Sequence, residues 1–219
     1  MRNRSTRFAL VLAGLLAIQH GIAGACSAGT LVIPATQVQA TDVFSGPSFT
    51  VSGNFGPNDV VSVRGVGVVD LASGDFKVNA AGVIVAPQTT NTGNHPGELY
   101  FAAAAVRPDV PVGAVLIGNN SLGFCPLFPD DTATGLGSPT PPTDISVINR
   151  SLGDIFGPGF SGISSGTVLQ LRVNDENTFD NTGSFLISSV PEPSSLVLAA
   201  VAGLLLTATA LRRFGTNAA

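Results

Sequence analysis

The chain has 219 residues, of which 26 are Gly, 15 are Pro, 13 are Phe and none is Trp, and only 11% are charged. Charged residues are about half as frequent as in an ordinary soluble domain, and the mean hydropathy is +0.40, but much of the apolar content lies in two short stretches, 8–18 and 196–211. Between them lies a middle part of about 160 residues, the length of one domain. This distribution argues against a polytopic membrane protein and against a coiled coil.

The middle of the chain is acidic. Residues 26–190 contain five basic and thirteen acidic residues, a net charge of −8. Nucleic acids require a basic face for their phosphates, so we expect no nucleic-acid partner. An acidic domain is compatible with calcium binding, and equally with a charge that only keeps the protein soluble.

Residues 1–25 have the pattern of a secretory signal peptide. Three arginines precede the apolar run 8–18, and Ala23-Gly24-Ala25 follows as an A-x-A cleavage site. The run is shorter than the roughly 20 apolar residues that a membrane-spanning helix needs. We therefore expect export and cleavage before Cys26; a lipoprotein signal that modifies Cys26 is the alternative.

The middle, residues 26–189, is predicted to be a single all-β domain. Residues 167–173 alternate strictly between polar and apolar side chains, as in a strand that buries one face. The predicted strands are 48–52, 60–69, 81–85, 99–103, 114–118, 145–148, 167–173 and 184–190, separated by turn sequences such as Asn181-Thr182-Gly183. Many short strands and no convincing helix favour an antiparallel β-sandwich of the jelly-roll kind.

Oxygen-bearing side chains gather between the last two predicted strands. Residues 175–181 read Asp-Glu-Asn-Thr-Phe-Asp-Asn, so five of the seven carry a carboxylate or an amide. Calcium takes about six to eight oxygen ligands, which makes this loop a candidate calcium site. The alternative is a turn whose Asp and Asn side chains bond to their own backbone.

The same loop and its flanking strands resemble the bacterial calcium-dependent galactophilic lectins. In those proteins an Asn-Asp pair leaves a strand and an Asn-Asn-Ser-Gly-Ser-Phe segment returns, to which Asn174-Asp175 and the segment 181–185 are similar. Segments 58–63 and 112–118 are similar to the family more loosely. The resemblance implies a β-sandwich fold and a sugar-binding calcium ion.

Carried over by position, the resemblance implies calcium ligands from the side chains of Asp175, Asp180 and Asn181 and from a loop carbonyl near Thr178. It also implies a glycan contact at His95, which with the following proline is similar to the family's sugar-contacting His-Pro pair. The loop is shorter than in the lectins and has Asp180 where they have Asn. The resemblance therefore supports the fold more strongly than the sugar-binding activity.

A pattern of three parts ends the chain. Pro191-Glu192-Pro193 is followed by the apolar stretch 196–211 and then by Arg212-Arg213. The prolines prevent a helix from continuing upstream, and the arginines hold the far end of the tail in the cytoplasm. Residues 190–219 thus resemble the PEP-CTERM sorting signal, and an ordinary tail anchor is the alternative.

This second resemblance implies partners and a location. The partners are an exosortase and the export machinery, with a short transmembrane helix that anchors the chain transiently in the inner membrane. The final location is then the cell envelope, the cell surface or the extracellular matrix.

The only two cysteines are Cys26 and Cys125. Disulfides persist in exported proteins, so we expect the two to pair. Lipidation of Cys26, or a Cys125 that is simply buried in the core, are the alternatives.

No catalytic constellation stands out. Residues 162–166 match the G-x-S-x-G string of serine hydrolases, but no histidine follows His95 in the chain to act as the base. We expect no enzyme. The expected function is a structural or adhesive role in the exopolysaccharide matrix or at the cell surface, and calcium-dependent glycan binding is one form that it could take. The alternative is a secreted hydrolase that acts on polysaccharide.

Overall fold

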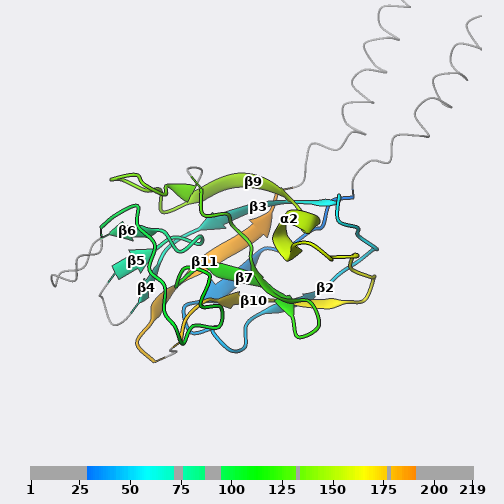
Figure 1. Ribbon diagram of the computed structural model, residues 1–219, viewed down its shortest axis with the longest axis horizontal. Coiled ribbons are helices and arrows are strands. Elements are labelled where there is room, and N and C mark those ends of the chain that lie inside the picture. Colours follow the sequence, from blue (N-terminus) through cyan, green and yellow to red (C-terminus); the bar gives the residue numbers. More distant parts are fainter. Residues whose placement is uncertain (1–28, 72–75, 87–94, 132–133, 177–178, 191–219) are drawn as a thin grey trace, which may run out of the picture.

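The computed structural model describes residues 29–71, 76–86, 95–131, 134–176 and 179–190. These residues form antiparallel β-sheets and one short helix, so the all-β class is confirmed (Figure 1). The strands are β1 (Thr36–Gln39), β2 (Ser48–Thr50), β3 (Val60–Val66), β4 (Val69–Leu71), β5 (Phe76–Val78), β6 (Ile84–Ala86), β7 (Val115–Asn119), β8 (Gly123–Pro126), β9 (Ile145–Ser151), β10 (Val168–Val173) and β11 (Thr182–Ser189); the helix is α2 (Leu152–Phe156).

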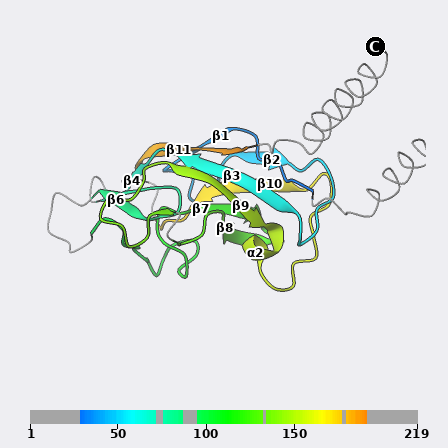
Figure 2. The same ribbon diagram turned by 90° about the horizontal axis from the view of Figure 1, so that it is seen from above.

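The strands form two sheets around one core. The larger sheet has the order β6-β5-β4-β11-β3-β9, with β1 also paired to β11, and the smaller has the order β2-β10-β7-β8. Figure 2 shows β11 between β1 and β3. Phe185 and Ile187 of the larger sheet and Leu169 and Leu171 of the smaller sheet belong to the same buried cluster. The predicted alternation of β10 is confirmed, because its leucines are buried while Gln170 is only half-buried.

Most of the predicted strands are present. The segments 48–52 and 167–173 contain β2 and β10, and the segments 81–85, 114–118, 145–148 and 184–190 overlap β6, β7, β9 and β11. The segment 60–69 divides into β3 and β4 at Gly67, whose φ is +104° and where a Cβ would lie 2.7 Å from the carbonyl oxygen of Ser184. The predicted strand 99–103 is wrong, because these residues form only an isolated bridge from Leu99 to Val83.

Four elements were not predicted, namely β1, β5, β8 and α2. β1 reads Thr-Gln-Val-Gln, so Val38 is its one apolar residue, too little for an alternating pattern. The helix α2 has only five residues, and the hydroxyl of Ser151 caps it by accepting a hydrogen bond of 3.0 Å from the backbone N–H of Asp154. Within the described ranges no helix has the length and apolar character to span a membrane.

The first and last described residues lie beside β3. The N–H of Leu31 donates to the carbonyl oxygen of Val60 at 2.8 Å, and that of Val190 donates to the carbonyl oxygen of Ser62 at 2.9 Å. Figure 1 places both of these ends at the upper edge of the coloured domain. We call this part of the molecule (29–33, 58–62, 189–190) the terminal end. The predicted signal peptide, the sorting motif with Pro191, Glu192 and Pro193, and Arg212 and Arg213 lie outside the described residues.

Candidate functional site

Three segments meet where β10 ends and β11 begins. They are residues 40–47, 98–113 and 174–181, described except for 177–178, and we call them the loop end. The N–H of Val173 donates to the carbonyl oxygen of Asp42 at 2.9 Å, and the N–H of Gly113 donates to that of Asn174 at 2.7 Å. These bonds bring the predicted calcium loop against two segments that are far from it in the sequence.

The side chain of Asn174 holds the loop end together. Its Nδ2 donates to the carbonyl oxygens of Val110 at 2.7 Å, Arg107 at 3.0 Å and Pro111 at 3.1 Å, while its Oδ1 accepts from the N–H of Arg107 at 2.8 Å. The residue is fully buried. Its side chain thus forms hydrogen bonds with backbone groups that take no part in strand pairing. Asn174 was identified from the sequence only as the neighbour of Asp175.

Two of the four predicted calcium ligands touch each other. Both Asp175 and Asn181 are 6% exposed, and Oδ2 of Asp175 accepts a hydrogen bond of 2.6 Å from Nδ2 of Asn181. Oδ1 of Asp175 accepts a bond of 2.6 Å from the N–H of Glu176. Asp180 is half-buried, and Thr178 lies outside the described residues.

These contacts allow a first test of whether calcium fits. A buried carboxylate beside an amide supplies oxygens of the kind calcium takes, but the amide directs its nitrogen at Asp175, and an ion would need the oxygen of Asn181 there instead. In the described part of the chain no three acidic, His or Cys side chains come close enough together to hold a metal. Bonds of the kind expected for an Asp- and Asn-rich turn are present, and calcium binding stays a prediction.

His95 lies in an exposed turn beside β6. Its N–H donates to Oε2 of Glu98 at 2.9 Å, and the N–H of Glu98 donates back to the carbonyl oxygen of His95 at 3.1 Å. The N–H of Gly97 bonds to Ile84 at 2.9 Å and so fixes this turn to the larger sheet. The imidazole is therefore accessible, and its contact with a glycan stays a prediction.

A hollow of about 230 Å³ opens beside the segment 98–113, and its lining includes Arg107, Asp109, Asp130 and Arg150. Nε and Nη2 of Arg107 donate to the two carboxylate oxygens of Asp109 at 2.8 and 2.6 Å. This hydrogen-bonded guanidinium lowers the pKa of Asp109. A general acid needs a raised pKa. Asp109 is therefore suited to keep its charge and not to donate a proton.

Arg150 has a structural role at the other side of this hollow. Its Nη1 donates to the carbonyl oxygen of Pro126 at 2.8 Å, and its Nη2 donates to that of Asp154 at 3.0 Å. Burial lowers the pKa of Arg150. These bonds connect β9, the end of β8 and α2. The guanidinium of Arg150 therefore bonds mainly to backbone carbonyls and has a structural role.

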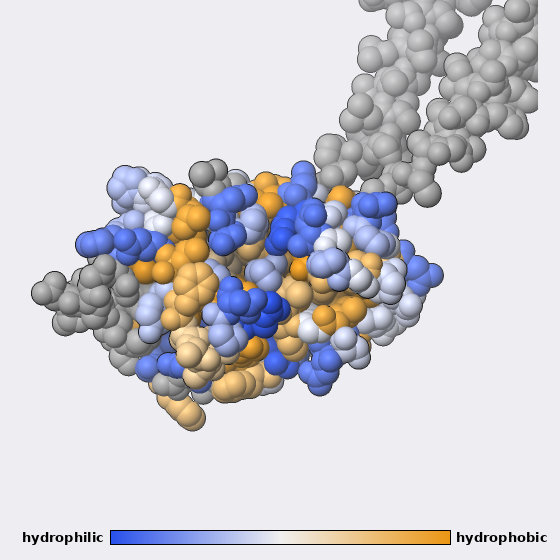
Figure 3. All heavy atoms as spheres, in the orientation of Figure 1, coloured by the Kyte–Doolittle hydropathy of each residue, from blue (hydrophilic) through white to orange (hydrophobic). Residues whose placement is uncertain are grey.

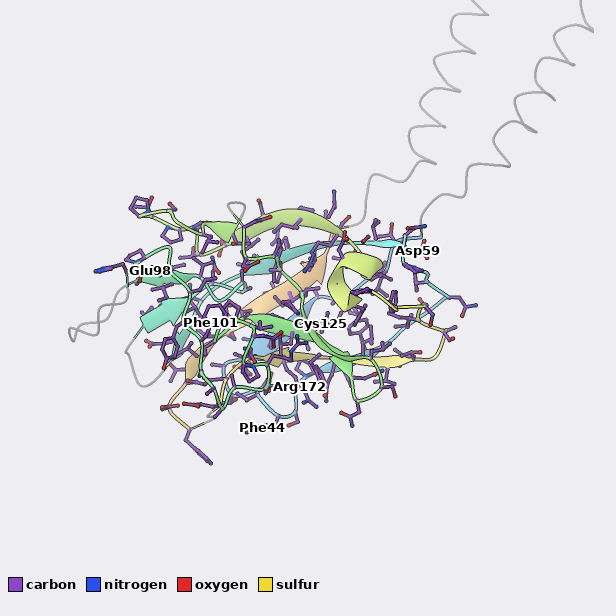
Figure 4. The ribbon with its side chains drawn as sticks, in the orientation of Figure 1. Phe44, Asp59, Glu98, Phe101, Cys125 and Arg172 are labelled. Atoms are coloured by element: carbon purple, nitrogen blue, oxygen red, sulfur yellow. The ribbon has the colours of Figure 1, made fainter. Side chains whose placement is uncertain are left out.

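Cys125 is half-buried on β8, and its sulfur lies 4.0 Å from Nη1 of Arg107 (Figure 4). Cys26, its predicted partner, lies outside the described residues. The disulfide therefore stays a prediction.

The loop end also carries a group of exposed aromatic side chains, which was not predicted from the sequence. Phe44 is 61% exposed and Phe179 is 96% exposed, and Tyr100 and Phe101 are exposed as well. Figure 3 shows hydrophobic side chains that extend down the left half of the domain to its lower boundary, and Figure 4 places Phe101 and Phe44 in this region. A count of aromatic residues cannot separate exposed rings from core rings, so only the structure reveals this group.

Comparison of this chain with known protein families, with curated proteins and with solved structures finds no match. Its function is therefore inferred from its own residues and their arrangement.

Proposed function

We propose that the chain is an exported protein of the cell surface or exopolysaccharide matrix, sorted by an exosortase through residues 190–219, with a structural or adhesive domain between its two ends. We further propose that the two sheets form a jelly-roll-like β-sandwich and that the apolar stretch 196–211 forms a short transmembrane helix. The shared core of the two sheets supports the first of these details.

The observation that carries this proposal is the separation of the two ends of the domain. β11 begins at the loop end with Thr182 and finishes at Ser189, two residues before Pro191. Eight residues of strand extend over about 25 Å. A membrane anchor in the tail would therefore hold the terminal end near the bilayer and present the loop end to the surroundings, as an adhesive surface protein requires.

The sorting part can be tested in cells by replacing Pro191, Glu192 and Pro193 with alanine. We expect this variant to stay in the inner membrane with its tail intact, whereas the wild-type chain is processed and leaves the membrane. The matched control replaces Ser194 and Ser195 with alanine and keeps the motif. If the triple variant reaches the same mature mass and location as the wild type, the tail is no sorting signal.

A calcium-dependent contact with a glycan is the more specific part of the proposal. The side-chain oxygens of Asp175, Asp180 and Asn181 and a carbonyl near Thr178 would hold the ion, and the bound ion would attract sugar hydroxyls. A ligand that binds only the folded state stabilises it, by about 2.7 kcal/mol at a hundredfold excess over Kd. The support for this part is that the side chains of Asp175 and Asn181, both 6% exposed, lie side by side, so that an amide turned to present its oxygen would place two ligand oxygens together.

Thermal melting in EDTA and in millimolar calcium tests the ion. We expect calcium to raise the midpoint by several degrees, and Asp180→Ala, which removes the ligand oxygen, to abolish this shift. Asp130→Asn, an equal change of charge at an exposed residue outside the loop end, should keep it. Equal midpoints of the wild type in both buffers would leave the loop as a hydrogen-bonded turn without an ion.

A further inference from the structure

Among the described side chains, exposed aromatic rings are confined to the loop end. Where side chains are described, the large hydrophobic residues exposed elsewhere are aliphatic, while the exposed aromatic residues are Phe44, Tyr100, Phe101 and Phe179. Removing an aromatic side chain from water is favourable, and exposed apolar groups that gather in one region mark an interaction surface. The loop end is therefore the part of the described surface where a ligand gains most from contact with rings.

The rings are carried by three separate segments on a fixed base. Phe44 belongs to 40–47, Phe101 to 98–113 and Phe179 to 174–181. Backbone bonds from Val173 to Asp42 and from Gly113 to Asn174 hold these segments together. Exposed rings on three segments of one preorganised base suit an extended ligand with a repeated apolar face, because such a ligand can contact more than one ring at once.

The charge of the loop end restricts what can bind there. Its three segments contain six acidic residues (Asp42, Glu98, Asp109, Asp175, Glu176 and Asp180) and one basic residue, Arg107, a net charge of −5. Arg107 is itself paired with Asp109 at 2.6 Å. Like charges across an interface oppose association. Anionic lipid surfaces, anionic polysaccharides and the loop end of a second copy are therefore disfavoured.

We propose that an uncharged polysaccharide chain lies across the loop end and stacks the C–H faces of its sugar rings on Phe44, Phe101 and Phe179. This inference rests on the proposed surface or matrix function and names its ligand class. Sugar hydroxyls donate hydrogen bonds to carboxylates, so the exposed acidic side chains of the loop end assist binding without an ionic partner. Stacking needs no metal ion, so this binding persists in EDTA.

Affinity electrophoresis of the full-length chain in neutral detergent with EDTA tests the proposal. The gels contain galactomannan, a β-glucan or dextran as uncharged polymers, alginate as the anionic polymer, or polylysine as the cationic polymer. We expect at least one uncharged polymer, and not alginate, to retard the wild-type chain. Replacing Phe44, Phe101 and Phe179 together with alanine should weaken this retardation roughly tenfold or more.

Two control variants separate stacking from other effects. Val147→Ala removes a 46%-exposed aliphatic side chain from the edge strand β9 and should leave the retardation unchanged. Phe179→Tyr keeps a ring and should retain binding, whereas Phe179→Leu keeps only an apolar side chain and should weaken it. Circular dichroism of each variant shows whether the fold is intact.

Several results would overturn the inference. If no uncharged polymer retards the wild-type chain in EDTA, or if the triple variant binds as the wild type does, the rings hold no polysaccharide. Binding that needs calcium and ignores the three phenylalanines would support the calcium loop and leave the proposed function standing. Binding only to polylysine, lost at high salt, would identify a basic partner instead. The cell experiment with the Pro191, Glu192 and Pro193 replacements tests the proposed sorting. Its result does not affect the retardation measured here.

Discussion

The two ends of the domain are held together by different means. At the terminal end, main-chain bonds dominate, such as those from Leu31 to Val60, from Val190 to Ser62 and from Ser189 to Ile33. At the loop end, the buried side chain of Asn174 takes the place of a strand ladder. Because main-chain bonds form with almost any residue type, the terminal end should tolerate substitutions that the loop end does not.

The largest expected effect is that of Asn174→Ala. The change removes the partner of the buried carbonyl groups of Val110 and Pro111, and of the partly buried carbonyl and N–H of Arg107. A buried group left without a partner costs about 1–3 kcal/mol, so we expect a loss of about 4 kcal/mol in the free energy of unfolding. Urea unfolding followed by circular dichroism measures it. Asn120→Ala, a change at an exposed asparagine, should stay within about 0.5 kcal/mol. Similar losses in both variants would mean that Asn174 does not hold the loop end.

A second test concerns Gly113, whose N–H bonds to Asn174. Its φ is +83°, and a Cβ there would lie 2.3 Å from Cγ2 of Val78, so Gly113→Ala combines backbone strain with overpacking. We expect a loss of about 3 kcal/mol. Gly137 has a φ of +76° but open space around it, and Gly137→Ala should cost only about 1 kcal/mol. Thermal melting of both variants separates the effect of overpacking on the midpoint from the effect of backbone strain. Equal shifts of the midpoint would show that overpacking at Gly113 contributes nothing.

The third prediction concerns Asp59, whose side chain bonds to two backbone N–H groups at the terminal end. Oδ1 of Asp59 accepts from the N–H of Gly29 at 2.5 Å, and its Oδ2 accepts from that of Gly56 at 2.6 Å. These groups are partly buried, so water can replace part of what Asp59→Ala removes, and we expect a loss of about 1–2 kcal/mol. Urea unfolding measures the loss in the free energy of unfolding for Asp59→Ala and for Asn174→Ala under the same conditions. A loss as large as that of the asparagine variant would contradict the difference between the two ends.

The smallest expected effect is that of the exposed pair between Arg107 and Asp109. Exposed ion pairs contribute at most about 1 kcal/mol, so Asp109→Asn should change stability by less than that at neutral pH. The guanidinium lowers the pKa of Asp109 in the folded state. Its contribution is therefore present above the unfolded-state pKa and is lost as the pH falls through the lower, folded-state pKa.

Urea unfolding of wild type and Asp109→Asn from neutral to strongly acidic pH measures this. The difference between them should shrink only in the acidic range. A difference that grows on acidification would show that the folded state favours protonated Asp109. That result would contradict the lowered pKa that Arg107 causes.

The sequence predicted the strands whose apolar residues alternate, and missed the elements that depend on distant partners. The alternation of β10 is visible in the sequence, because Leu169 and Leu171 are buried against the core. β1 forms because it pairs with β11, from Thr36 opposite Ile187 to Gln39 opposite Ser184. No local pattern indicates that pairing.

The candidate site was predicted to a similar extent. The contact of Asp175 with Asn181 joins residues of one loop, which a sequence motif can indicate. The bonds of Asn174 to Val110 and the exposure of Phe44 depend on how separate segments meet. A single sequence carries no signal for such meetings, because they follow from the completed fold.

The position of β11 has a consequence for how the chain folds. This last strand pairs with β1 along 184–187, with β3 along 186–189 and with β4 at 182–183. The larger sheet therefore lacks its central strand until the end of the domain has been synthesised. Contacts between residues so far apart in sequence slow folding. In the export that we propose, the chain crosses the membrane from its N-terminus, so closure of the domain waits for the arrival of Ser189.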